Sequence, residues 1–236
     1  MATALWKEDI VQKNRFSRPG ISLLSVMAIV VHWTANPGGS DEAHANYFDG
    51  EDGGGGRAAS AHLFVDRDSA SLIVPLNEVA YQANEKPSKV KRLLASVPTY
   101  RGGNANLNTI GVEMCVEKDG TIHKDTVART VKVVAELCKR FKLDPSADIY
   151  RHYDITGKNC PAPWVARPDL FEQFKKDVKV ASTPKPTIKA VYHVVKKGET
   201  VSGIALKYKT TIQRIKVLNK LKNIDLIYPG QKLRVK

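Results

Sequence analysis

The sequence predicts a mixed α/β fold, in which helices flank a central mixed β-sheet and a small strand–helix–helix–strand unit follows. Three observations support this prediction. The apolar run "MAIVVHW" at 27–33 is typical of a strand buried on both faces, the segment 124–143 has helical periodicity, and residues 191–236 carry a separate pattern of short strands and helices. At 236 residues the chain exceeds the usual size of one domain, so we expect two.

Two more strands and one long helix are expected in the first part of the chain. The segments "SAHLFVDRD" at 60–68 and "NTIGVEMCV" at 108–116 have the composition of strands, and the second alternates with period two. The helix at 124–143 would begin at a cap formed by Asp125 or Thr126. Its apolar face is expected to contain Val127, Val131, Val134, Cys138 and Phe141.

The glycine-rich run "GEDGGGGR" at 50–57 is incompatible with regular secondary structure. No Gly-Lys-Ser/Thr sequence follows it, which argues against a phosphate-binding loop. We therefore expect a mobile surface loop.

Composition excludes several classes of protein. With 42% hydrophobic and 26% charged residues, the chain is neither generally disordered nor a coiled coil. Its most apolar stretch, 21–31, is much shorter than the roughly 20 residues that cross a bilayer. The N-terminus lacks a basic region leading into an apolar one, so no secretory signal peptide is expected. Three cysteines argue against a disulfide framework and fit synthesis in a reducing cytoplasm.

The net charge of +13 is concentrated at the C-terminal end. From Val191 onward, 11 Lys and Arg residues accompany only Glu199 and Asp225, which gives +9, whereas residues 1–180 hold 24 basic and 22 acidic residues. Between these parts, "ASTPKPTIKA" at 181–190 has the composition of a semi-extended tether. We therefore expect a first domain at 1–180, a linker at 181–190 and a basic second domain at 191–236.

The segment "RHYDITGKNCPAP" at 151–163 groups residue types that bind metal ions. His152 and Cys160 lie in it, and His32 sits at the end of the buried strand expected around 27–33, where side chains project into a cleft above the sheet. Two histidines and a cysteinate suit Zn²⁺, and three protein ligands leave a fourth position for water, as in catalytic zinc sites. The alternative remains open, because a histidine at a strand end is more often a hydrogen-bonded structural residue.

Four segments in this order, "VVHWTA", "SAHLFVDRD", "IGVEMCVE" and "RHYDITGKNCPAP", resemble the zinc-dependent N-acetylmuramoyl-L-alanine amidases of phage endolysins, bacterial autolysins and peptidoglycan recognition proteins. The resemblance covers about residues 20–178. It implies three zinc ligands, a catalytic carboxylate and an electrophilic lysine. In this sequence these are His32, His152 and Cys160 for zinc, Glu113 as the carboxylate and Lys158 as the lysine.

The predicted roles make chemical sense for hydrolysis of an unactivated amide. Glu113 shares one strand face with Gly111 and Cys115, so it could take a proton from water and deliver it to the leaving nitrogen. Lys158 precedes Cys160 by two residues in an extended loop and could stabilise the developing oxyanion. The alternatives are a surface carboxylate and a solvated loop lysine.

The remaining polar candidates are given structural roles. Some relatives carry a tyrosine at the position of Ala61 and assign it part of the catalytic work. In this sequence that role is expected to fall to Glu113 alone. His62 is expected to line the cleft or pack in the core without binding metal, and Asp154 to have a structural role. Other expected structural residues are His44 on a helix surface, His123 in a hairpin, and Cys115 and Cys138 as buried small hydrophobic residues.

The second domain closely resembles a LysM module, on the segments "GETVSGIALKY" and "YPGQKL". The resemblance implies binding of N-acetylglucosamine-containing glycans between the loops 198–201 and 223–227. The glycan-binding candidates are Gly198, Glu199, Thr200, Asn223, Ile224 and Asp225. A rival interpretation is that "TTIQRIKVLNKL" forms half of a DNA-binding helix-turn-helix motif. The strands expected on either side of the segment argue against it.

Together these features predict a monomeric peptidoglycan hydrolase that cleaves the bond between N-acetylmuramic acid and L-alanine. We expect a phage or prophage endolysin for Gram-positive walls, made in the host cytoplasm, with peptidoglycan and anionic wall polymers as partners and no nucleic acid. The alternatives are a host autolysin of the same activity, a non-catalytic peptidoglycan sensor, and a thiol hydrolase built on Cys160 and His152.

Overall fold

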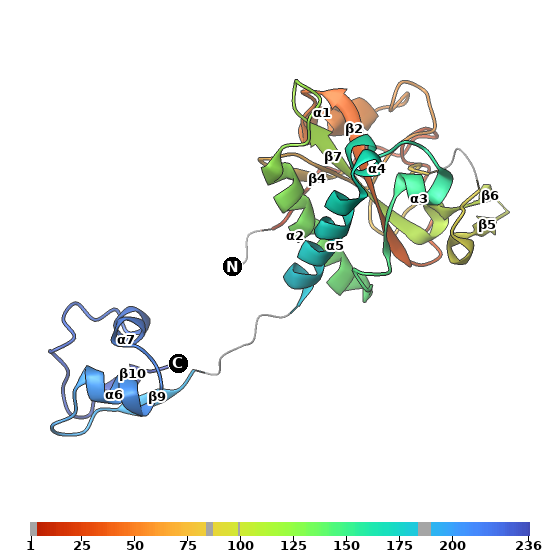
Figure 1. Ribbon diagram of the computed structural model, residues 1–236. Helices are drawn as coiled ribbons and strands as arrows, with labels where there is room; N and C mark the ends of the chain where they lie inside the picture. Colours follow the sequence, from red (N-terminus) through yellow and green to blue (C-terminus); the bar gives the residue numbers. More distant parts are fainter. Residues whose placement is uncertain (1–3, 84–86, 99, 184–189) are drawn as a thin grey trace. The chain divides into compact units, whose positions relative to one another are not determined.

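The computed structural model describes residues 4–83, 87–98, 100–183 and 190–236 (Figure 1). The chain divides into two compact units, Met1–Thr183 and Pro184–Lys236. Within the described residues, none of the helices combines the length and apolar character required to cross a membrane.

The first unit is built on a six-stranded mixed sheet with the strand order β1-β4-β3-β7-β2-β8. Parallel pairing joins β2 to β7 and β8, β3 to β7, and β1 to β4, whereas β3 and β4 are antiparallel. This confirms the predicted mixed sheet. The strands are β1 (Lys7–Glu8), β2 (Ala28–Pro37), β3 (Leu63–Val65), β4 (Ala70–Leu72), β7 (Thr109–Val116) and β8 (Ile149–Arg151).

The first half of strand β2, residues 28–32, is buried on both faces, as its apolar sequence predicts, whereas Ala35, Asn36 and Pro37 are exposed. Ile29 and Val31 pack into the main core with residues of α2 and α5, while Ala28 and Val30 pack with Ile155 in a second cluster on the opposite face. The strand does not end at His32, however, because it continues to Pro37. A register shift between Trp33 and Pro37 accompanies this extension.

Helices cover the sheet, and α2 and α5 lie side by side against one face (Figure 1). A separate antiparallel pair, β5 (Ala95–Val97) and β6 (Tyr100–Asn104), and two 3₁₀ turns, η1 (Lys91–Leu93) and η2 (Ala105–Asn108), precede β7. The helices of this unit are α1 (Asp41–Phe48), α2 (Lys124–Phe141), α3 (His152–Thr156), α4 (Ala162–Ala166) and α5 (Pro168–Ser182).

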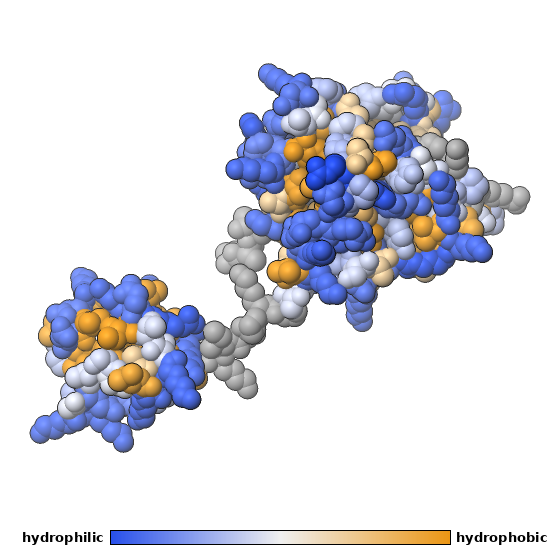
Figure 2. Space-filling view, viewed as in Figure 1, coloured by the Kyte–Doolittle hydropathy of each residue, from blue (hydrophilic) through white to orange (hydrophobic). Residues whose placement is uncertain are grey.

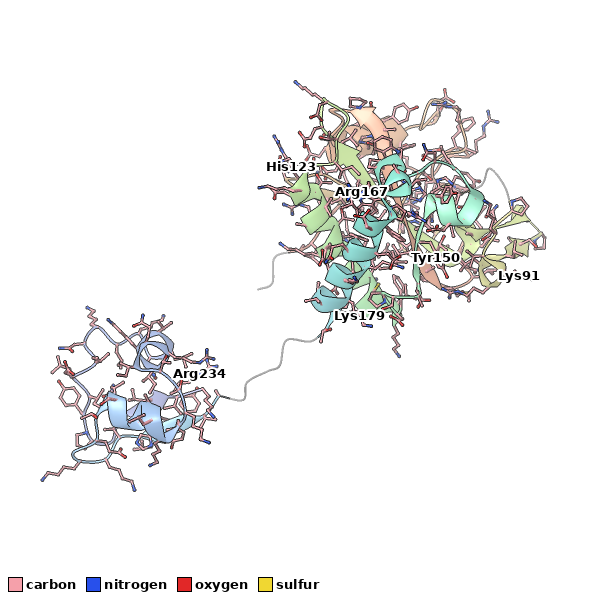
Figure 3. The ribbon with its side chains drawn as sticks, in the orientation of Figure 1. Lys91, His123, Tyr150, Arg167, Lys179 and Arg234 are labelled. Atoms are coloured by element: carbon pink, nitrogen blue, oxygen red, sulfur yellow. The ribbon has the colours of Figure 1, made fainter. Side chains whose placement is uncertain are left out.

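Helix α2 confirms the predicted helix, but its N-terminal cap differs. The cap is His123, at the start of α2 in Figure 3, whose Nδ1 accepts a hydrogen bond from the Asp125 backbone N–H at 3.2 Å. His123 is therefore a capping residue, and Asp125 lies in the first turn, where its charge complements the helix dipole. The buried face is also rotated slightly from the prediction. Thr126, Thr130, Val133, Leu137 and Cys138 are buried, whereas Val127, Val131 and Phe141 are partly buried.

The glycine-rich segment 50–57 forms turns, in agreement with the absence of regular structure. Part of it is not at the surface, since Gly53 and Gly54 are buried. A Cβ atom at Gly54 would lie 3.0 Å from the Phe48 ring. The segment thus packs against the end of α1.

The second unit has the predicted strand–helix–helix–strand order, with β9 (Tyr192–Val194), α6 (Val201–Lys207), α7 (Ile212–Leu218) and β10 (Lys232–Arg234). Strands β9 and β10 pair antiparallel, and Thr200 and Thr211 cap the two helices. Figure 2 shows hydrophobic residues exposed among hydrophilic ones on this unit. Its own core contains Val195, Val201, Ile204, Ala205, Ile215, Leu233 and Val235.

Helix α5 extends to Ser182 and Thr183 caps it, so the first residues of the predicted linker, 181–190, are helical. Ala181 packs against the main core, which explains why the helix continues into this segment. Most of the remaining linker, 184–189, lies outside the described residues.

Candidate active site

Sheet topology brings the candidate ligands to one edge of the first unit. Strands β2, β7 and β8 are parallel neighbours, so their carboxyl ends lie at the same edge. His32 of β2 is directly opposite Glu113 of β7. His152 follows β8 at once as the first residue of α3.

His32, His152 and Cys160 converge into one buried cluster. The Nδ1 atoms of His32 and His152 lie 3.1 Å apart, and the Cys160 Sγ atom lies 3.8 Å from His32 Nδ1. The three donor atoms are all within 4.8 Å of one another. The structure thus brings together three residues that are distant in sequence.

The chemistry of this donor set fits a zinc ion, and two of its three donor separations lie close to those of a tetrahedral site. Ligand atoms at about 2.0–2.3 Å from one tetrahedral zinc ion are separated by about 3.3–3.6 Å. The observed separations of 3.1 and 3.8 Å lie on either side of this range. Imidazole nitrogen and thiolate sulfur are also the ligand types that zinc prefers.

Glu113 lies beside the cluster in an environment that favours its protonated form. The residue is partly exposed to the cleft, but its Oε2 atom is buried and has no hydrogen-bond partner among the described residues. Burial raises the pKa of Glu113 to about 8, and the positive charge of Lys158 acts in the opposite direction. A carboxyl group with its pKa near neutrality can accept and return a proton.

Lys158 lies at the cleft in the loop between α3 and Cys160. Gly157 caps α3 with φ = 88°, a conformation that favours glycine, and the chain then turns so that the Cys160 N–H donates to the Lys158 carbonyl at 2.7 Å. The Lys158 side chain is exposed, and its charge acts on Glu113. The loop therefore places a cation and the thiol of a candidate metal ligand at the same cleft.

The candidate ligands line a cleft of about 760 Å³. Part of its wall comes from α1 and from residues 57–60. His44, predicted on a helix surface, is instead 6% exposed and stacks on Phe64 with ring centroids 4.9 Å apart. Burial lowers the pKa of His44, so its ring is a neutral part of the wall. Other lining residues are Trp33, Asn36, Tyr47, Phe48, Arg57, Ser60, Tyr81, Gln82 and Asn159.

His62 packs in the core, outside the donor cluster. It is fully buried, its Nδ1 accepts from the Gly111 N–H at 3.0 Å, and its Nε2 donates to the Glu78 carbonyl at 2.9 Å. Burial lowers its pKa to about 4. Both ring nitrogens are therefore occupied by backbone groups.

Asp154 and the other two cysteines have structural positions. The Asp154 carboxylate accepts three hydrogen bonds from Arg151, at 2.7, 2.9 and 3.1 Å, so it closes the first turn of α3. Cys115 and Cys138 are buried, as expected. Burial raises the pKa of both thiols, that of Cys138 to about 12.

Sequence analysis missed Gln82 and the aromatic residues that α1 contributes to the wall of the cleft. Gln82 is 6% exposed and contacts His32, yet it belongs to no strand, helix or recognisable motif. The only sign of a buried polar role was its position after the short segment "VAY" at 79–81. Tyr47 and Phe48 follow the polar start of α1, and no periodicity links them to the cleft.

In the second unit, several glycan-binding candidates also stabilise the fold. Glu199 Oε2 contacts His193 Nε2 at 2.6 Å and accepts from the Lys196 N–H at 2.8 Å, and Thr200 caps α6. Ile224 packs against the core. Gly198 has φ = 85°, and Asn223 Oδ1 accepts from the Asp225 N–H at 2.9 Å. These contacts stabilise the conformations of the two loops.

A mixed β-sheet flanked by helices, with three buried candidate metal ligands beside a carboxyl group, is typical of metal-dependent hydrolases. Residues 23–163 match the N-acetylmuramoyl-L-alanine amidase family, which is more than half of the chain. The chain belongs to this family. Residues 193–236 match the LysM domain.

Individual relatives agree with this assignment. The N-acetylmuramoyl-L-alanine amidase BlyA of Bacillus subtilis (strain 168) is 46% identical over 192 residues, which cover 79% of this chain and 50% of BlyA. The amidase CwlL of Bacillus licheniformis is 41% identical over 216 residues, which cover 87% of this chain and 58% of CwlL. The chain thus spans about half the length of the curated relatives it matches.

The solved structure of PlyL has the same fold. It superposes with a TM-score of 0.58 at 22% identity and covers 75% of this chain and 99% of that chain.

Proposed function

We propose that this chain is a zinc-dependent N-acetylmuramoyl-L-alanine amidase, which hydrolyses the amide between N-acetylmuramic acid and the L-alanine of the stem peptide. The observation that carries the proposal is the convergence of His32, His152 and Cys160 beside Glu113 in one cleft. Family membership supports the reaction type.

The three buried donors would hold the zinc ion. When bound, zinc supplies Lewis acidity, which polarises a carbonyl and lowers the pKa of water. The buried positions of His32, His152 and Cys160 limit competition from solvent for the same donors.

Glu113 would transfer the proton, and Lys158 would stabilise the negative charge that develops during the reaction. Glu113 accepts a proton from the attacking water and passes it to the leaving nitrogen, a role for which a pKa near neutrality is suited. Lys158 is exposed at the cleft and stabilises negative charge that develops on the carbonyl oxygen.

The LysM domain would hold the enzyme on its polymeric substrate. We assign glycan contacts to the loops 198–201 and 223–227, at Gly198, Glu199, Thr200, Asn223, Ile224 and Asp225. The net charge of +9 from Val191 onward adds attraction to anionic wall polymers. Strands β9 and β10 pair with each other and share one core with α6 and α7. This arrangement supports a glycan-binding LysM domain over a helix-turn-helix.

The biological setting that fits best is a phage or prophage endolysin that lyses Gram-positive walls, with a host autolysin as the alternative. Both act on the same bond, and similarity to amidases of Bacillus species supports the wall type.

Digestion of purified walls by the full chain tests the reaction. We expect new alanine amino groups and no new reducing sugar ends. Reducing ends alone would indicate a glycosidase, and no product from metal-loaded protein would indicate a non-catalytic sensor.

Chelation tests the metal. Exhaustive removal should abolish lysis and zinc should restore it, and His32→Ala, His152→Ala and Cys160→Ala should each lower bound zinc. Lysis that persists without metal and disappears on thiol alkylation would favour the thiol hydrolase.

A further inference from the structure

Gln82 contacts the edge of the His32 ring that points away from His152 and Cys160. It belongs to the segment that follows β4, its side chain is 6% exposed, and its Oε1 atom lies 2.9 Å from His32 Nε2. On its other side, Gln82 Nε2 donates to the Thr109 carbonyl at 3.2 Å and to Thr109 Oγ1 at 3.0 Å. A single buried carboxamide thus links His32 to the start of β7.

The contacts with Thr109 determine which way the carboxamide points. A backbone carbonyl can only accept hydrogen bonds, so the amide nitrogen of Gln82 must face it. Thr109 Oγ1 donates its own proton to the Ala105 carbonyl at 2.8 Å, which leaves it an acceptor for the same nitrogen. The carbonyl oxygen of Gln82 therefore faces His32.

This orientation determines the tautomer of His32. Because Gln82 Oε1 can only accept, the neutral imidazole of His32 must carry its proton on Nε2 and donate it to Gln82. The lone pair then lies on Nδ1, the atom directed at His152 Nδ1 and Cys160 Sγ. The opposite tautomer would place a proton on the donor atom of the cluster.

Packing against β7 holds the carboxamide in place. A Cβ atom at Gly111 would overlap Gln82 Oε1, so only glycine at this position allows the carboxamide to lie against the strand. The close approach explains a glycine within an otherwise apolar strand.

We propose that Gln82 is a positioning residue that fixes His32 in the Nε2–H tautomer and so prepares its Nδ1 atom to bind metal. The proposal rests on the proposed zinc site. Loss of such a hydrogen bond behind a ligand histidine typically costs about 10–100-fold in metal affinity.

The tautomer is tested without metal. In the metal-free full chain, ¹⁵N NMR of the imidazole rings should show neutral His32 protonated at Nε2. An Nδ1–H tautomer overturns the proposal.

Zinc affinity, measured by competition with a chromophoric chelator, tests the consequence. Gln82→Met keeps the length of the side chain without its hydrogen bonds and should bind zinc about 10–100-fold more weakly. Gln82→Glu, as a protonated carboxylic acid, can still accept from His32 and donate to Thr109, so it should retain affinity within a few fold. Gln173→Met, the same change on the exposed surface of α5, is the matched control and should bind as the wild type.

The outcomes separate the two proposals. If the wild type binds no zinc, the proposed function and the role of Gln82 fail together. If the wild type binds zinc and Gln82→Met binds it equally well, the role of Gln82 alone is wrong. If Gln82→Met unfolds, Gln82→Glu decides: affinity close to that of the wild type supports the proposal, and a loss as large as 100-fold with the fold intact overturns it.

Discussion

Replacement of Glu113 by glutamine should lower activity and raise the stability of the metal-free protein. The wild-type carboxyl has a buried Oε2 atom without a hydrogen-bond partner among the described residues, and its pKa is raised from 4.5 to about 8 by burial. Glutamine has nearly the same shape and no charge, so it removes the burial penalty together with the ability to transfer a proton.

The size of the stability gain follows from the pKa. A carboxyl group whose folded-state pKa is raised favours the folded state below its unfolded pKa, and that advantage is lost as the pH rises. Each pH unit between 4.5 and 8 therefore costs the wild type about 1.4 kcal/mol relative to the variant. At pH 7 the upper limit is about 3 kcal/mol, which screening through the cleft reduces to about 1–3 kcal/mol.

Urea unfolding of the chelated proteins at pH 4.5, 6, 7 and 8 measures this difference, and wall digestion measures turnover. The variant should match the wild type at pH 4.5, exceed it increasingly toward pH 8, and lose at least about 10²-fold in turnover while it retains zinc. Glu8→Gln, on the exposed strand β1, should change neither quantity. A stability difference independent of pH, or near-normal turnover, would refute the reasoning.

Three further predictions concern other groups. Lys158→Ala should reduce kcat by at least about 10²-fold without loss of bound zinc, because the lysine stabilises charge and is not a ligand; a loss of zinc stoichiometry would contradict this. His62 has its pKa lowered to about 4, so stability present above pH 6.5 should fall by about 3 kcal/mol as the pH drops to 4. His62→Gln should flatten that part of the urea-midpoint profile, and an unchanged slope would exclude His62 as its source. Binding of the full chain to walls should weaken between 0.1 and 1 M salt, as the Debye length falls from about 10 to about 3 Å, but only for walls that retain anionic polymers; equal loss on acid-stripped walls would argue against a charge-based component.

The outlines of the fold could be predicted from the sequence where burial follows a local pattern. The apolar run before His32 predicted β2, and helical spacing predicted α2. The short strands β1, β4 and β8 have only two or three residues each and carry no such pattern. They exist because a neighbouring strand supplies their hydrogen bonds, which is a property of the sheet and not of the segment.

Some residues of the candidate site could also be predicted from the sequence, and others could not. Residue types pointed to His32, His152 and Cys160, because few side chains can bind a metal ion. The resemblance to the amidase family then pointed to Glu113 and Lys158. The sequence alone was also enough to mark a strongly basic second domain. His44 was misplaced because its burial depends on Phe64, which belongs to a different element.

Only the tertiary structure decided how these groups act on one another. His32 and His152 are 120 residues apart in the chain and come within hydrogen-bond distance because β2 and β8 are parallel neighbours. The raised pKa of Glu113 and the tautomer of His32 likewise depend on burial and on Gln82, 50 residues from His32. The sequence by itself determined which chemical groups are present and which segments must be buried. Strand register and desolvation, which are long-range and require the folded chain, determined their protonation, orientation and reactivity.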